Sequence, residues 1–411
     1  MKNILFILPF LPYPLKSGGH QAIFNGIKAV TNDYNVFITY CEDETENSSL
    51  TQQELIKTLG SHINIIPYKK QQKKESRSFA LRSYIAFWKL KEKIKRKLRT
   101  IKEKDIPHFF QITITDDERV LFLNDIIKKY NIDIVQCEMI STISDVLVLP
   151  PSVKKIYVQH QIDYVRCQLD LKENGLLDDF KKELAHCKKN EIFLLNRFDT
   201  IIVLSDYDKN LMQQDGVTAP IYVSPAIVTT SIKYFEFRTQ RKILSFVGPS
   251  MHYPNVDGIL WFLKNCWSEL RRREPDFILQ IIGEWDKQTR KEIQRIYPEI
   301  IFHGYVSNLD KYIENTIMIV PINIGSGIRM KILEAVSLGI PVVSTSIGAQ
   351  GLPLKNGEDC FITDNPLIFV EDILKLNDIK KQEAMTKCAQ EKISKQYSFS
   401  SLKETRLNIY K

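Results

Sequence analysis

The sequence predicts an α/β protein with two doubly wound domains that face one another across a central cleft. Short runs rich in Ile, Val and Phe alternate with amphipathic stretches, which is the pattern of parallel strand–helix units. Many of these runs are apolar at nearly every position, as in strands covered by helices on both faces. The alternation stops at 229–241, which has no strong apolar period, and restarts at Lys242. We therefore expect a linker there and a second domain after it.

The individual strands follow from the apolar runs. In the first half of the chain we expect strands at 3–9, 35–40, 63–68, 132–137, 155–160, 200–205 and 221–224. In the second half we expect strands at 242–247, 277–282, 300–303, 316–321, 341–345 and 360–363. The first domain is accordingly assigned residues 1–230, with a basic helical insertion at about 69–104. The second domain is assigned residues 231–395, and we expect a last helix at 396–411.

Composition excludes several classes of protein. The 411 residues are 44% hydrophobic and 26% charged, which is ordinary for a globular protein and excludes collagen-like and disordered chains. The longest apolar runs, such as 4–12, are far shorter than the roughly 18–20 residues of a membrane span. We expect neither a signal peptide nor a membrane anchor. The seven cysteines are scattered and never spaced as C-x-x-C, so we expect a reducing cytoplasm, no disulfide framework and no metal site.

Positive charge is concentrated in one segment. The chain carries a net charge of +8, yet 69–104 alone holds fifteen Lys or Arg against three Glu. Aromatic and aliphatic residues are interleaved with these cations at helical spacing, which favours contact with an anionic membrane surface. The alternative is a helix pair of the first domain whose apolar side is core and whose lysines are solvated. No RNA or DNA motif accompanies the charge, so we expect no nucleic-acid partner.

The segment 321–345, PINIGSGIRMKILEAVSLGIPVVST, carries the strongest functional signal. It combines the end of a strand, a glycine loop with Gly325, Ser326 and Gly327, and a helix expected over 328–338. Glycines ahead of a helix allow backbone N–H groups to approach an anion at the positive end of the helix dipole. This segment therefore predicts a phosphate site.

Charged residues of the expected helix support that prediction. Arg329 and Lys331 lie in its first turn, where the dipole disfavours cations unless an anion binds there. Glu334, about two turns from the loop, is a candidate acceptor for ribose hydroxyls. The alternative is a plain strand–turn–helix unit with solvated charges, because a glycine loop by itself is weak evidence.

Two segments of the first domain are expected at the same cleft. In 8–24 a strand and a Pro-rich loop are followed by Gly18 and Gly19, and His20 lies either in the cleft or on the helix surface. The segment lacks the G-x-G-x-x-G spacing of a dinucleotide fold, which argues against a nicotinamide dehydrogenase. In the second segment, His160 ends a strand and Asp163 follows. His160 is a candidate contact for a substrate hydroxyl, although a histidine at a strand end is often structural.

These motifs together resemble one family. The segment 325–352 resembles the donor-nucleotide signature of bacterial glycosyltransferase family 4, whose members have the GT-B fold of two facing Rossmann-like domains. Further similarity covers most of the chain: Gly18-Gly19, HQIDY at 160–164, SFVGPSMHYPNVDGILWF at 245–262, IIG at 281–283 and HGYV at 303–306. The resemblance implies transfer of a sugar from a nucleotide diphosphate sugar, with retention and without metal or other cofactor. It also implies that the second domain binds the donor, that the first sets the acceptor, and that the last helix crosses back to the first domain.

The resemblance assigns residues to roles. Glu334 matches the second of two family glutamates, which holds the donor ribose, and His160 matches a histidine placed against the donor sugar; these two are the expected catalytic residues. The residues expected at the donor diphosphate are Gly18, Gly19, Gly325, Ser326, Gly327, Arg329 and Lys331. The expected partners are the donor and a glycan, lipid-linked or protein acceptor of the cell envelope. The expected location is the cytoplasm, peripheral at the inner face of the membrane.

Two departures from the family pattern qualify this assignment. The first family glutamate falls on Ser326, and the stretch 249–255 lacks the arginine and lysine that many relatives carry there. We hypothesise that Arg329 and Lys331 replace the missing charge at the diphosphate. The departures also leave open a nucleotide-sugar epimerase of the same fold and a catalytically silent binding subunit.

Overall fold

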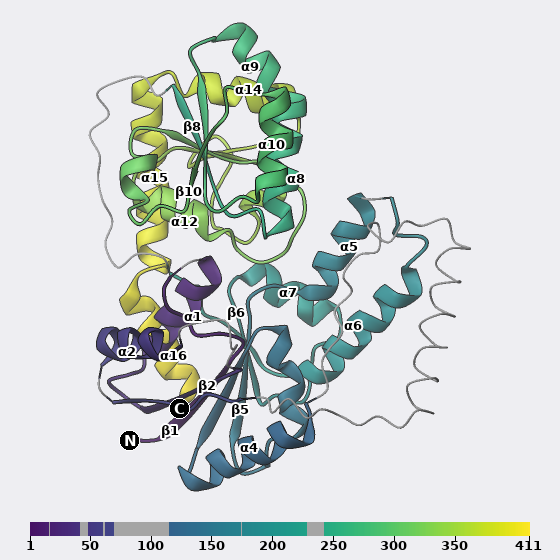
Figure 1. The fold of residues 1–411 in the computed structure, drawn as a ribbon, viewed down its shortest axis with the longest axis vertical. Coiled ribbons are helices and arrows are strands. Elements are labelled where there is room, and N and C mark those ends of the chain that lie inside the picture. Colours follow the sequence, from purple (N-terminus) through teal and green to yellow (C-terminus); the bar gives the residue numbers. More distant parts are fainter. Residues whose placement is uncertain (16, 42–47, 61, 70–114, 174, 228–241) are drawn as a thin grey trace.

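The computed structural model describes residues 1–15, 17–41, 48–60, 62–69, 115–173, 175–227 and 242–411. The expected linker at 229–241 and all but the first residue of the basic insertion at 69–104 lie outside the described residues. Figure 1 shows two α/β domains, with the first domain below the second in that view. None of the helices in the described residues combines the length and the apolar character that a membrane crossing requires.

The first domain is a seven-stranded parallel sheet in the order β3-β2-β1-β4-β5-β6-β7. Its strands are β1 (Asn3–Leu8), β2 (Asn35–Tyr40), β3 (Ile63–Ile65), β4 (Ile134–Glu138), β5 (Lys154–Gln159), β6 (Thr200–Val203) and β7 (Ile221–Val223). Its helices are α1 (Gly18–Lys28), α2 (Ser48–Leu59), α4 (Asp117–Lys129), the 3₁₀ helix η2 (Ile140–Leu147), α5 (Asp163–Glu173), α6 (Lys181–Leu195) and α7 (Asp206–Gln214). The order reverses beside β1, so the carboxyl ends of β1 and β4 border a switch point, where doubly wound sheets bind ligands.

The second domain is a six-stranded parallel sheet in the order β10-β9-β8-β11-β12-β13. Its strands are β8 (Ile243–Val247), β9 (Ile278–Ile282), β10 (Ile301–Gly304), β11 (Ile317–Val320), β12 (Val342–Ser344) and β13 (Phe361–Ile362). Its helices are α8 (Tyr253–Phe262), the π-helical turn η3 (Leu263–Trp267), α9 (Ser268–Arg273), α10 (Lys287–Ile296), α11 (Asp310–Ile313), α12 (Met330–Ser337), α13 (Ser346–Ala349), α14 (Pro366–Lys375) and α15 (Ile379–Gln396). The predicted fold of two facing parallel α/β domains is confirmed.

Each predicted strand is present, with small differences at its ends. The largest difference is at β3, which ends at Ile65 rather than at residue 68. Pro67 has no N–H to donate and interrupts the ladder, and pairing resumes only at the isolated bridge between Cys41 and Tyr68. The helix expected over 328–338 begins two residues later, at Met330. Arg329 is therefore the N-cap rather than a first-turn residue, because the extended loop continues through it.

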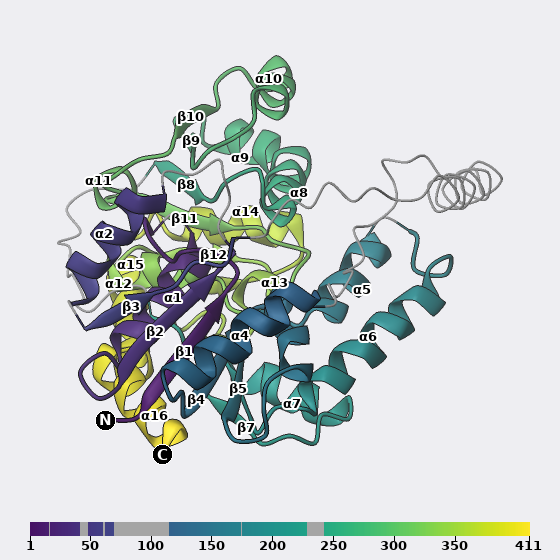
Figure 2. The ribbon, with the colours of Figure 1, turned by 60° about the horizontal axis from the view of Figure 1, so that its bottom comes forward.

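The last helix, α16 (Phe399–Tyr410), leaves the second domain and packs against the first. In Figures 1 and 2 this yellow helix lies on the first domain, where it contacts the purple α1. The Nζ of Lys154, at the start of β5, donates to the carbonyl of Ile409 at 2.7 Å and binds the end of α16 to the sheet. A cation at this end of a helix also interacts favourably with the helix dipole.

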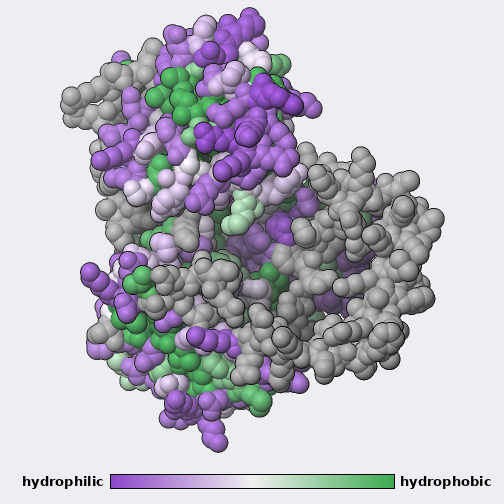
Figure 3. Space-filling view, viewed as in Figure 1, coloured by the Kyte–Doolittle hydropathy of each residue, from purple (hydrophilic) through white to green (hydrophobic). Residues whose placement is uncertain are grey.

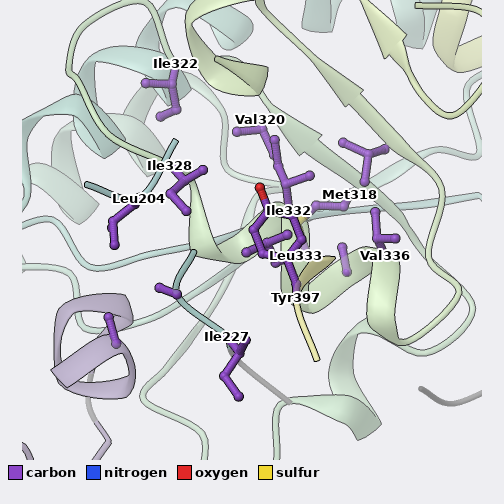
Figure 4. Close-up of a cluster of buried hydrophobic side chains, with 14 of the residues drawn as sticks. Leu204, Ile227, Met318, Val320, Ile322, Ile328, Ile332, Leu333, Val336 and Tyr397 are labelled. Atoms are coloured by element: carbon purple, nitrogen blue, oxygen red, sulfur yellow. The ribbon is translucent and has the colours of Figure 1, made fainter. Parts of the chain in front are cut away.

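The two domains share one apolar core beside the cleft. Figure 4 shows Leu204 and Ile227 of the first domain in the same cluster as Ile328, Ile332 and other residues of the second. All four side chains are buried. Burial of apolar side chains contributes about 25 cal/mol per Å², so this cluster stabilises the contact between the domains.

Candidate active site

The glycine loop of the second domain lies directly against the end of a strand of the first domain. Gly327 has a φ of +78°, and a Cβ atom at this position would lie 2.3 Å from the carbonyl oxygen of His160. Both the left-handed backbone and the close approach require glycine. The neighbouring Ser326 hydroxyl donates to the carbonyl of Ile162 at 2.9 Å. The structure thus joins two segments that the sequence analysis had singled out separately, and Ser326 connects the domains.

The glycines after β1 have a comparable steric reason. Gly18 and Gly19 are the first two residues of α1 rather than part of the loop before it. A Cβ atom on Gly18 would lie 2.6 Å from the Cγ of Met330, and one on Gly19 would lie 2.9 Å from the Cε of Met139. The start of α1 therefore touches the start of α12.

Three helices begin at this contact. Lys331, in the first turn of α12, donates to Asn255, in the first turn of α8, at 2.8 Å. None of α1, α8 and α12 has an acidic residue in its first turn, and α8 and α12 have no side-chain cap. The Ser17 hydroxyl caps α1 by accepting from the N–H of His20. Helix N-termini carry partial positive charge, and their first N–H groups have no partner within the helix. Their convergence makes a site suited to an anion.

Lys331 supplies a full charge to the same place. Its Nζ also lies 4.0 Å from the ring centroid of Phe246 in β8. Burial, together with the nearby Arg329, lowers the pKa of Lys331 to about 7. A lysine with this pKa is only partly charged at neutral pH, and a bound anion would favour its charged form.

Arg329 is directed at the glycine loop. Its Nη1 donates to the carbonyls of Ser326, at 2.8 Å, and of Gly327, at 2.5 Å. Burial lowers the pKa of its guanidinium to about 10. Within the described residues, two buried donors of this loop have no hydrogen-bond partner: Nη2 of Arg329 and Nδ2 of Asn323. Buried donors without partners are costly, and a bound ligand with acceptor oxygens would satisfy them.

Two further basic residues face this cluster. His252 is the N-cap of α8. Desolvation by the packed protein around the imidazole lowers the pKa of His252 to about 4, and the cations Lys331, Arg329 and Arg166 add to this effect. Arg166 belongs to α5 of the first domain, so positive groups from both domains meet here. In the space-filling view the surface recedes between the two domains (Figure 3).

Glu334 lies one turn farther along α12 than Lys331, and it also faces the first domain. Its Oε1 accepts a hydrogen bond from Nε2 of Gln21 in α1, at 3.4 Å. Burial raises the pKa of this carboxyl to about 7, Asp310 adds to the effect, and Gln21 and Lys331 oppose it. The carboxylate lies close enough to Lys331 for each to influence the other.

The ring of His160 is hydrogen-bonded to the buried carboxylate of Glu138. Its Nε2 bonds Oε2 of Glu138, at the end of β4, at 2.5 Å. The side chain of Glu138 is 2% exposed and that of His160 11% exposed. Because the ionised carboxylate can only accept, this contact places a proton on Nε2. The Nδ1 atom is the ring nitrogen that remains for a ligand.

The other expected residues take structural positions. The Nδ1 atom of His20 bonds the Ser17 hydroxyl at 2.7 Å, and its ring stacks on Phe10 at 4.3 Å. Asp163 is buried as the first residue of α5, where it accepts from Gln161 at 2.9 Å. Burial raises its pKa to about 6.

Sequence reasoning missed Glu138, Asn255, Arg166, His252 and Asn323 as parts of the site. Glu138 and Arg166 become neighbours of the site only when strands and domains pack, so no local pattern indicates them. Asn323 lies within PINIGSG, and a polar residue in a buried loop was a usable signal. Within the described residues, no group of three or more His, Cys, Asp or Glu side chains is arranged to hold a metal ion.

Comparisons with known proteins agree with this geometry. Residues 241–378 match the model of the family described as glycosyl transferases group 1. A Klebsiella pneumoniae protein, described as an uncharacterized 44.6 kDa protein in the cps region, is 24% identical over 393 residues, which are 91% of this chain and 90% of that protein.

Solved structures share the architecture of the whole chain. S. aureus TarM, in a complex with fondaparinux, alpha-GlcNAc-glycerol and UDP, superposes with a TM-score of 0.69 at 15% identity and 100% coverage of both chains. Anabaena HepE, in a complex with UDP and glucose, gives 0.66 at 13% identity, with 100% of this chain and 99% of that chain covered. Sucrose-phosphate synthase of Thermosynechococcus elongatus gives 0.69 at 12% identity, with 100% and 98% covered. The fold is therefore GT-B, and residues 241–378 of the second domain match the group 1 glycosyl transferase family.

Proposed function

We propose that the protein transfers a sugar from a UDP-sugar to a glycan or glycoconjugate of the cell envelope, with retention and without a metal ion. The observation that carries the proposal is the meeting of three helix N-termini with Lys331 beside the glycine loop. Uridine is supported by TarM and HepE, whose structures contain UDP. The acceptor class is supported by the alpha-GlcNAc-glycerol bound to TarM and by the cps region of the Klebsiella relative.

The chemistry explains why positive charge is needed there. The bond between the anomeric carbon and the diphosphate oxygen breaks, so the sugar becomes oxocarbenium-like while negative charge grows on the departing UDP. Helix N–H groups, Lys331 and Arg329 stabilise that charge, and they are already in place before the reaction. The acceptor oxygen then bonds the anomeric carbon on the face from which UDP leaves, and its proton passes to the departing phosphate.

The remaining residues orient the donor. Glu334 accepts hydrogen bonds from the ribose hydroxyls, and Nδ1 of His160 meets a hydroxyl of the donor sugar. The backbone of the loop Gly325 to Gly327 contacts the diphosphate, with the N–H groups of Gly18 and Gly19 opposite. Contact between the domains at Gly327 and His160 keeps water away from the reacting carbon, which suppresses hydrolysis of the donor.

Removal of the Glu334 carboxylate tests the donor site. We expect calorimetric titration with UDP-, GDP-, dTDP- and ADP-sugars, in EDTA, to show binding of a UDP-sugar that Glu334→Ala abolishes. Glu383→Ala changes an exposed glutamate of α15 in the same domain, so it is the matched control and keeps full affinity. Binding that requires added divalent cation would contradict the metal-free mechanism.

A product assay distinguishes sugar transfer from the two alternatives, a nucleotide-sugar epimerase and a catalytically silent binding subunit. The transferase forms a glycosylated acceptor. An epimerase interconverts donor sugars without an acceptor, and a binding subunit does neither. Incubation of UDP-sugars with glycan and lipid-linked acceptors, followed by mass spectrometry, distinguishes the three outcomes.

Donor affinity is expected to have a bell-shaped pH dependence with a maximum near pH 7. Lys331 has a pKa of about 7 and loses its charge above this pH, which weakens contact with the diphosphate. Glu334 also has a pKa of about 7 and gains a proton below it, so it accepts fewer hydrogen bonds from the ribose. A UDP-sugar has no phosphate group that titrates near pH 7, so both limbs belong to the protein. Calorimetry from pH 5.5 to 8.5 checks this, and Lys331→Met should remove the alkaline limb while Glu334→Gln removes the acidic one.

The basic insertion adds a proposal about location. From its charge alone we infer that 69–104 holds the protein on the anionic inner surface of the membrane, where a lipid-linked acceptor would be found. Flotation with phosphatidylglycerol vesicles tests this. Flotation that persists in about 1 M salt, where the Debye length is about 3 Å, would contradict an electrostatic attachment.

A further inference from the structure

A line of buried polar side chains connects the last helix to His160. It begins at Tyr410 in α16, whose side chain is fully buried. The Oη of Tyr410 donates to Oε1 of Gln136 in β4. Burial raises the pKa of Tyr410 to about 12, so its hydroxyl keeps the proton and acts as a donor at neutral pH. The ring packs edge-on against Tyr34, with centroids 5.7 Å apart.

The line continues along one face of β4. Residues two apart on a strand lie on the same face, so Gln136 and Glu138 are neighbours there. The Nε2 of Gln136 donates to Oε1 of Glu138 at 2.6 Å. The side chain of Gln136 is 0% exposed and that of Glu138 is 2% exposed. Because Oε1 of Gln136 accepts from Tyr410, its Nε2 must face Glu138, and the orientation of the amide is settled by its two partners.

The line ends at the donor site. The second carboxylate oxygen of Glu138 bonds Nε2 of His160 at 2.5 Å. His160 is in turn the residue whose carbonyl touches Gly327 of the second domain. Each side chain in the line is therefore hydrogen-bonded to the next, from the Tyr410 hydroxyl to the His160 ring. The Tyr410 hydroxyl is also hydrogen-bonded to Arg406 of the same helix.

The polar side chains of this line lie in an otherwise apolar part of the core. The neighbouring side chains in this part of the sheet, Ile134, Ile156 and Val158, are apolar and buried in the same core cluster. Apolar side chains at Gln136 and Glu138 would fill such a core without the cost of burying polar groups. A polar line that crosses an apolar layer and ends on a ring in the donor site is explained by the orientation it gives that ring.

We propose that Tyr410 is a positioning residue for His160, acting through Gln136 and Glu138. The hydroxyl of Tyr410 orients the Gln136 amide, the amide orients the Glu138 carboxylate, and the carboxylate keeps the proton of His160 on Nε2. The ring then presents Nδ1 to the donor. The catalytic consequence rests on the proposed function, whereas the orientation of the ring does not.

The orientation is tested by NMR of the full-length protein with ¹⁵N-labelled histidine. His160→Asn identifies the ring signals of His160 among the seven histidines. We expect a downfield, slowly exchanging Nε2 proton in the wild type, and we expect it to shift or broaden in Tyr410→Phe. Glu138→Gln should remove it. Tyr34→Phe is the matched control, because it removes a hydroxyl from the ring that packs against Tyr410 and leaves the line intact.

Kinetics then separates positioning from a loss of stability. For Tyr410→Phe we expect kcat for transfer to fall about ten- to a hundred-fold, the range seen when a residue that orients a metal-bound histidine is removed. KM for the donor and UDP affinity should stay within twofold, and Tyr34→Phe should match the wild type. An unchanged His160 signal in Tyr410→Phe would overturn the proposal, as would equal falls in kcat for Tyr410→Phe and Tyr34→Phe. If the wild type transfers no sugar, the proposed function fails, and the NMR result alone decides whether Tyr410 orients His160.

Discussion

Replacement of Lys331 by methionine should weaken binding of the UDP-sugar about ten- to a hundred-fold. Hydrogen bonds to charged groups contribute about 1.5–3 kcal/mol, and 1.4 kcal/mol is a factor of ten in affinity. Methionine keeps an unbranched side chain over Phe246, which the lysine contacts at 4.0 Å, and loses only the charge and the donor. Calorimetry with the UDP-sugar selected above measures the change.

The control for Lys331→Met removes a charge that lies away from the site. Lys380 is exposed at the start of α15, and Lys380→Met should leave the affinity for the UDP-sugar unchanged.

Single variants of Lys331 and Arg329 distinguish the roles of these two cations, which were expected to act together. Arg329 already donates to two loop carbonyls, so Arg329→Met should disturb the loop as well as the charge. Unchanged donor affinity in the double variant of Lys331 and Arg329 would refute the hypothesis that they replace the missing basic pair.

Substitution of Gly327 by alanine should lower kcat/KM about a hundred-fold. The left-handed backbone at Gly327 costs roughly 1–2 kcal/mol for any residue with a Cβ atom. In addition the new methyl group would lie 2.3 Å from the carbonyl oxygen of His160, so the two domains must separate locally. A displacement of about 1 Å at reacting groups is enough for a hundred-fold loss of rate.

The chain contains a close control for this substitution. Gly357 has a φ of +80°, against +78° for Gly327, but nothing lies within 4 Å of the position its Cβ would take. Gly357→Ala should therefore show the backbone cost alone, as a fall in melting temperature with normal kcat/KM. If both variants lose activity equally, the contact between Gly327 and His160 has no role in catalysis.

Much of the fold could be predicted because its strands are buried on both faces. Strands such as β1 and β11 are apolar at nearly every position, and such runs are visible without knowing their neighbours. The ends of elements were harder to predict, because they depend on single hydrogen bonds. At β3 the interruption by Pro67 shortened the strand, and at α12 the loop through Arg329 delayed the helix.

The site was predictable in part for a different reason. Gly325, Gly327 and Lys331 lie within seven residues of one another, so their pattern is local. Partners from other elements were not predictable, because only packing brings them together. Asn255 meets Lys331 from 76 residues away, and Glu138 meets His160 because β4 and β5 are neighbours in the sheet. The sequence analysis attributed Gly18 and Gly327 to a phosphate site alone. The structure adds a second reason for glycine at both positions, because a Cβ atom there would clash with a residue across the contact between the domains.

The first domain is discontinuous in sequence, because its final helix, α16, comes after the whole second domain. A fragment ending near residue 227 would lack α16 and would expose the polar and apolar groups that Tyr410 and its neighbours cover. Domain swaps between relatives should therefore exchange residues up to the linker together with the last helix. A chimera that takes the two from different parents would join surfaces that were never selected to fit.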